Sequence, residues 1–81
     1  MIDTGDHVHH APTGETWVVA FVENDHLYWL GWPPGRADLA DCTLVRKASP
    51  QERKNILISM VCMDGDVRGE YARRKVLEEK L

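Results

Sequence analysis

The stretch TWVVAFVENDHLYWLGW, residues 16–32, limits what this chain can fold into more than any other part of it. Thr, Val, Phe, Tyr and Trp favour extended strands, and they lie on both sides of Asn24-Asp25, a pair suited to a tight two-residue turn. We therefore predict a β-hairpin with strands at 15–22 and 26–32.

The turn sets the register of this hairpin and therefore its two faces. With Asn24 and Asp25 as the loop, the expected pairs are Glu23–His26, Phe21–Tyr28, Val19–Leu30 and Trp17–Trp32. Side chains alternate along a strand, so the opposite face would carry Val18, Ala20, Val22, Leu27 and Trp29. Both faces are apolar, whereas a hairpin with one wet side alternates apolar and polar residues. One face should line a barrel-like core, and the C-terminal segment should cover the other.

Shorter extended segments flank the hairpin. Residues 5–11, GDHVHHA, have one apolar position, Val8, and suit a short strand. The flanking features are a turn at 12–14, a strand-ending Pro-Pro-Gly at 33–35, a polar loop at 36–41 and a further strand at 42–47. These segments predict a small, partly open SH3-like β-barrel of four or five short strands over residues 1–48.

The pattern becomes helical after Ala48. Ser49-Pro50-Gln51-Glu52 matches a capping box with proline at the first helical position. A second helix should begin after Asp66 and bury a stripe of Val67, Tyr71, Ala72, Val76, Leu77 and Leu81. We expect residues 49–81 to form a helical hairpin packed on the barrel, so that residues 1–81 make one domain, mostly β with C-terminal α.

Charge separates the two halves of the chain. Residues 1–48 hold seven acidic and three basic side chains, while residues 49–81 hold six acidic and seven basic ones. The first half should therefore repel phosphate backbones. No apolar run approaches the roughly 18 residues of a membrane span, and the polar N-terminus does not resemble a signal peptide, so we predict a cytoplasmic protein.

The sequence gives little support to catalysis or to a bound metal. It contains no Gly-rich phosphate loop, no HExxH and no GxSxG motif. His7 and His9 share a strand face and are the candidate metal ligands, but the spacing HVHH fits no structural zinc pattern. We predict a protein that is not an enzyme and carries no cofactor.

Two kinds of binding site stay open. Tryptophan and tyrosine are preferred anchors of protein interfaces, which favours an unidentified protein partner at the aromatic, proline-rich edge. That edge comprises Tyr28, Trp29, Trp32, Pro33 and Pro34. The alternative is nucleic-acid binding through a basic cluster on the last helix, Arg68, Arg73, Arg74 and Lys75, although glutamates interleave with it. It also stays open whether all three tryptophans are internal.

The chain resembles a family of small uncharacterised proteins of phages and prophages. The shared pattern is met here by Gly5, Asp6, Val8, His10, Pro12, Gly14, Glu15, Trp17, Gly31, Trp32, Pro33, Leu39, Asp41 and Cys42, and by YARR at 71–74. This resemblance implies an accessory protein of a bacterial host cell, with no established activity to carry over. The opening Gly5-Asp6 and Val8 are also similar to SH3-like and KOW-type barrels, but the acidic barrel departs from the RNA-binding role of KOW domains.

Overall fold

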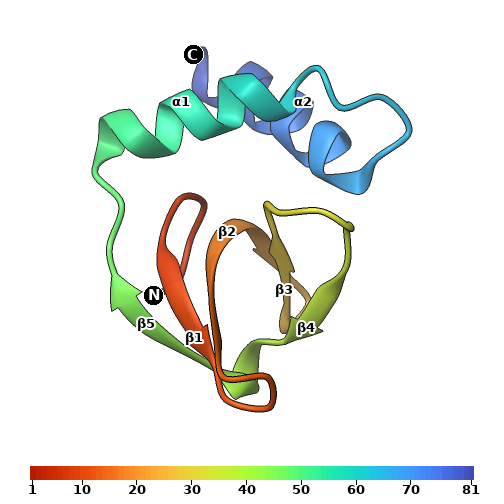
Figure 1. Cartoon of the computed structure of the whole chain (residues 1–81). Helices are drawn as coiled ribbons and strands as arrows, with labels where there is room; N and C mark the ends of the chain where they lie inside the picture. The colour runs from red at the N-terminus through yellow and green to blue at the C-terminus, as the bar shows by residue number, and fades with distance from the viewer.

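A computed structural model describes all residues from 1 to 81. It contains a curved five-stranded antiparallel sheet with two helices lying across one end of it (Figure 1). The elements are β1 (His7–His10), β2 (Glu15–Glu23), β3 (His26–Trp29), β4 (Arg36–Asp38), a 3-10 helix (Leu39–Asp41), β5 (Cys42–Arg46), α1 (Pro50–Met60) and α2 (Val67–Glu79). The strand order is β4-β3-β2-β1-β5. The predicted strand-rich half followed by helices is confirmed, but the sheet is not closed, because β4 and β5 lie at its two edges.

The long strand β2 holds the two parts of the sheet together. Its first half pairs with β1, and its second half pairs with β3. At the turn, Asn24 and Asp25 have positive φ angles of 53° and 63°, as a type I′ turn requires. The predicted pairs Glu23–His26 and Phe21–Tyr28 are confirmed.

The predicted register fails beyond Phe21. The register shifts between Val19 and Phe21, so that Val19 pairs with Trp29 instead of Leu30. One extra residue, Ala20, opposes no partner and bends the strand, as a β-bulge does. Trp17 does not pair with Trp32, because β3 ends at Trp29. On its other side, Trp17 lies opposite Val8 on β1.

Both sides of the hairpin are buried in hydrophobic clusters, which confirms the prediction of two apolar faces, but the members of each cluster differ from the predicted faces. The first joins Ala20 and Phe21 to both helices, and its fully buried members are Ala20, Phe21, Leu57, Met60, Tyr71 and Ala72. Phe21 is stacked between Tyr28 and Tyr71, with ring centroids 4.2 and 4.4 Å away. The second cluster lies inside the curved sheet and contains Val8, Val19 and Leu27. The bulge places Val19 and Phe21 in different clusters.

Two predictions about single segments are wrong. Residues 36–41 were expected as a loop, but Arg36–Asp38 form β4, which pairs with β3, and a 3-10 turn follows. On α2, Tyr71 and Ala72 are buried, whereas Val67 and Leu77 are exposed. The face of α2 that meets the sheet is therefore narrower than the predicted stripe.

Both helices begin where the sequence predicts. The Ser49 hydroxyl accepts the N–H of Glu52, and the Glu52 carboxylate accepts the N–H of Ser49, which completes the capping box. Asp66 caps α2 by accepting the N–H of Arg68. In the first turn of α2, a Cβ at Gly69 would lie 2.0 Å from the Met63 carbonyl oxygen. Glycine is therefore needed where the connection between the helices crosses α2.

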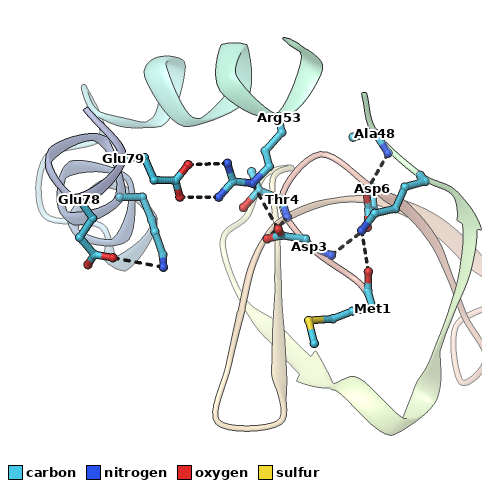
Figure 2. Close-up of polar contacts among 10 residues, drawn as sticks. Met1, Asp3, Thr4, Asp6, Ala48, Arg53, Glu78 and Glu79 are labelled. Carbon is cyan, nitrogen blue, oxygen red and sulfur yellow. Dashed lines mark hydrogen bonds and ion pairs between the residues drawn. The ribbon is translucent and has the colours of Figure 1, made fainter. Parts of the chain in front are cut away.

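A polar network ties the N-terminus to the helices (Figure 2). The buried Asp6 carboxylate accepts hydrogen bonds from the N–H groups of Asp3 and Ala48 and from Lys47 Nζ, at 2.8–2.9 Å. Arg53 on α1 reaches both Asp3 and Glu79, the last residue of α2. Burial raises the pKa of Asp6, but the hydrogen bonds from Ala48 and Lys47 outweigh it and the pKa lies below its usual value.

Candidate functional site

A surface groove of about 1110 Å³ lies beside β2, β3 and β4. It runs between the β1–β2 turn on one side and the β3–β4 connection with β4 on the other. The lining of the groove includes His10, Glu15, Thr16, Trp17, Trp29, Trp32, Pro33, Arg36, Asp38 and Asp41. Three of the five predicted protein-binding residues, Trp29, Trp32 and Pro33, therefore share one groove.

A column of aromatic rings runs along the groove. The His10 ring stacks on Trp17 with centroids 4.3 Å apart, and Trp17 contacts Trp29 at 4.6 Å with a tilt of 44°. The turn at 12–14 produces this arrangement, because it pairs β1 with β2 and places His10 and Trp17 on one face. His10 Nδ1 lies 2.8 Å from the Thr13 hydroxyl, which fixes the imidazole at the end of the column.

The β3–β4 connection folds over the other end of the column. Trp29 donates its indole N–H to the Pro33 carbonyl at 2.7 Å. A Cβ at Gly35 would lie 2.4 Å from the Trp29 ring, so only glycine lets the chain cross so close to the indole. Beside this packed ring, Trp32 is 85% exposed. One tryptophan is thus held by its neighbours while another projects freely at the same rim.

Arg68 on α2 binds the backbone at the start of this connection. Its side chain is 4% exposed, and Nη1 donates to the carbonyls of Trp29, Leu30 and Gly31 at 2.6–3.1 Å. The remaining guanidinium nitrogens bind the Asp66 carboxylate. The hydrogen bond from Arg68 holds the pKa of Asp66 below its usual value, although partial burial opposes it. The helical hairpin therefore determines the position of the tryptophan-bearing rim.

The groove carries an unbalanced negative charge. Glu15, Asp38 and Asp41 line it, and none of the three forms an ion pair with a lysine or arginine. Asp38 has only His26, at 3.8 Å, and keeps 73% of its side chain exposed. The lining contains no lysine and one arginine, Arg36, which donates to the Tyr28 hydroxyl at 3.4 Å.

The other two predicted protein-binding residues lie elsewhere. Tyr28 turns its ring toward the helices, where it stacks on Phe21. Tyr28 and Pro34 line a smaller hollow next to the start of α2. The expected continuous aromatic and proline edge is therefore divided between two surfaces, because Tyr28 and Trp29 are successive residues of a strand and point to opposite faces.

The predicted basic cluster on α2 does not form one surface. Arg68 is buried and bonded within the protein, so it cannot reach a phosphate. Arg73 donates to the Val61 carbonyl. Arg74 faces Glu23 and Lys75 faces Glu78, both at 3.5 Å. Each of these four cationic side chains thus already has a carbonyl or carboxylate partner within the protein.

The candidate metal ligands lie apart from the groove's aromatic column. His7 is half-buried, with Nε2 3.4 Å from Arg46, and His9 is exposed. The structure brings together no group of three or more His, Cys, Asp or Glu side chains that could hold a metal ion.

Sequence reasoning missed His10, Trp17, Asp38 and Asp41 as parts of one site. The turn at 12–14 was recognised and could have linked His10 to Trp17, because a short turn fixes which residues of two strands share a face. Nothing comparable in the sequence links the two aspartates to the tryptophans. Their meeting depends on β4 and the 3-10 turn.

Comparisons with protein-family models, with curated proteins and with solved structures found no match to this chain. Neither helix has the length and apolar character needed to cross a membrane.

Proposed function

We propose that this protein is a non-enzymatic interaction module that binds another protein in the groove beside Trp32. The observation that carries this proposal is the exposure of Trp32, at 85%, next to the column of His10, Trp17 and Trp29. Exposed tryptophans bordering a preformed hollow are typical anchor positions of protein interfaces. The hydrogen bonds from Arg68 to the backbone next to Trp32 support the proposal. They fix this part of the chain before a partner binds, which lowers the conformational entropy lost on binding.

The architecture in this proposal is a partly open SH3-like barrel. Three features support it: the strand order, the sharing of β2 between two parts of the sheet, and the short 3-10 turn between β4 and β5. The resemblance to small phage and prophage proteins adds a setting, an accessory protein in the cytoplasm of a bacterial host cell. That setting rests on the resemblance alone.

A selection experiment tests the binding role. The immobilised protein is offered a displayed library of random 12-residue peptides, in parallel with Trp32→Ala and with Leu77→Ala. Leu77 is the matched control, because it is an apolar side chain 80% exposed on α2, away from the groove. We expect the wild type and Leu77→Ala to enrich peptides, and Trp32→Ala to lose at least tenfold of that enrichment while its circular dichroism spectrum stays unchanged.

Two outcomes would overturn the proposal. One is an absence of enrichment, or equal enrichment by wild type and Trp32→Ala. The other is micromolar binding of mixed-sequence DNA or RNA that weakens steeply with salt while peptides are not bound, which would favour the nucleic-acid alternative.

A further inference from the structure

The groove contains carboxylates without a lysine or arginine partner, and their charge limits the kind of ligand that the groove can bind. Most carboxylates elsewhere on the molecule have a cationic partner, as Asp6 has Lys47 and Glu52 has Arg46. Glu15, Asp38 and Asp41 line one groove without a lysine or arginine partner. An anionic ligand such as a phosphate would be repelled here, whereas a cationic side chain would gain a partner that the chain itself does not supply.

The exposed indole narrows the choice among cations. A guanidinium is planar, can stack on an indole face and can pair with a carboxylate through two parallel hydrogen bonds. An ammonium is a point charge that binds more water and lacks the planar face. Trp32 is 85% exposed and lines the same groove as these carboxylates, so the groove suits arginine better than lysine.

The backbone of β2 adds a second kind of recognition. The Val18 carbonyl accepts the N–H of Leu30 at 2.9 Å, and the β2–β3 register ends with the neighbouring pair Val19–Trp29. Backbone groups point to alternate sides of a strand, so Thr16 directs its N–H and C=O the same way as Val18, away from β1. No strand pairs with Thr16 on that side, and Thr16 lines the groove. An extended segment could use these groups as an added strand does.

Taken with the proposed function, on which this inference rests, the geometry points to an extended segment of a partner protein that carries an arginine. Its backbone lies along Thr16, and its guanidinium stacks on Trp32 and pairs with Asp38 or Asp41. Arg36, the one arginine already in the groove, bounds the site on the β4 side.

The test uses four peptide pools in which nine-residue peptides are randomised except at the central position. That position holds arginine, its neutral near-isostere citrulline, lysine or glutamate. Binding is followed through the three tryptophan indole N–H signals in ¹⁵N-labelled protein. We expect the arginine pool to bind at least tenfold more tightly than the citrulline and glutamate pools, and severalfold more tightly than the lysine pool.

Variants assign the preference to the groove. The double change Asp38→Asn and Asp41→Asn should remove the difference between the arginine and citrulline pools. Glu70→Gln, which alters an exposed carboxylate on α2 outside the groove, should leave it unchanged. Methylating the backbone nitrogens on both sides of the central arginine should weaken binding at least fivefold, because it blocks strand-like hydrogen bonding.

The inference and the proposed function fail in different ways. If random peptides are enriched and lost with Trp32→Ala, but the four pools bind equally, the interaction role stands and the arginine-bearing segment is ruled out. Insensitivity to backbone methylation would rule out the extended mode. If no pool binds and no peptide is enriched, both are wrong.

Discussion

Replacing Arg68 tests whether one buried side chain connects the helical hairpin to the rim of the groove. Arg68→Met keeps an apolar stem of similar length but removes the guanidinium. That leaves the carbonyls of Trp29, Leu30 and Gly31 without their donor and Asp66 without its partner. Removing one member of a fully buried ion pair costs about 3–5 kcal/mol, because the remaining charge stays desolvated. Asp66 keeps 18% of its side chain exposed, so we expect the lower end of this range, about 3 kcal/mol. Domains of this size have free energies of unfolding of roughly 4–12 kcal/mol, so Arg68→Met should remove a large part of the total.

Urea unfolding provides the measurement, followed by circular dichroism and by tryptophan fluorescence. The matched control is Arg74→Met on the same helix, which loses an exposed pair with Glu23 at 3.5 Å and a contact of the guanidinium with the Tyr71 ring at 5.7 Å. It should change the free energy of unfolding by about 1 kcal/mol or less. Adding Asp66→Asn to Arg68→Met should restore about 1–2 kcal/mol, because the unpaired charge disappears while an asparagine cap remains. A loss below about 1 kcal/mol for Arg68→Met would refute the reasoning.

Three further substitutions test other contacts of the fold by urea unfolding. Gly69→Ala should destabilise the fold by about 1–3 kcal/mol, because its Cβ would meet the Met63 carbonyl at 2.0 Å, and a gain instead would contradict that contact. Ser49→Ala should cost about 1 kcal/mol through the lost cap of α1, and an unchanged midpoint would show that the cap is dispensable. Asp6 has a lowered pKa, so it stabilises the fold above the usual carboxyl pKa of about 4 and less as the pH falls through its native pKa. The free energy of unfolding should therefore fall more steeply in wild type than in Asp6→Asn as the pH decreases below the usual carboxyl pKa, and parallel curves would exclude this role.

Local signals in the sequence predicted most of the elements. Asn24-Asp25 predicted the hairpin turn, and Ser49 and Asp66 predicted both helix starts, because turns and caps depend on residues only a few positions apart. The apolar character of both hairpin faces predicted two buried sides, since exposed apolar surface is costly whichever element covers it. The bulge at Ala20 was not predictable in this way, and it shifts the partner of Val19 from the expected Leu30 to Trp29.

Part of the candidate site was predicted from residue type. Trp29, Trp32 and Pro33 were predicted as binding residues because tryptophan and tyrosine are preferred anchors of protein interfaces, and all three line the groove. Arg68 was misread as a contact to nucleic acid. Its charge was visible in the sequence, but its burial against the carbonyls of the β3–β4 connection was not.

By itself, the sequence determined four of the five strands, the hairpin turn, the helix caps and the need to bury both faces of one hairpin. Only the tertiary structure decided that the β1–β2 turn, β4 and the 3-10 turn meet around one groove, and that its carboxylates have no lysine or arginine partner. The physical reason is the sequence separation between the residues that interact. Turns and caps are fixed by neighbours along the chain, whereas the charge and shape of a groove depend on segments brought together by a bulged strand and by helices packed behind it.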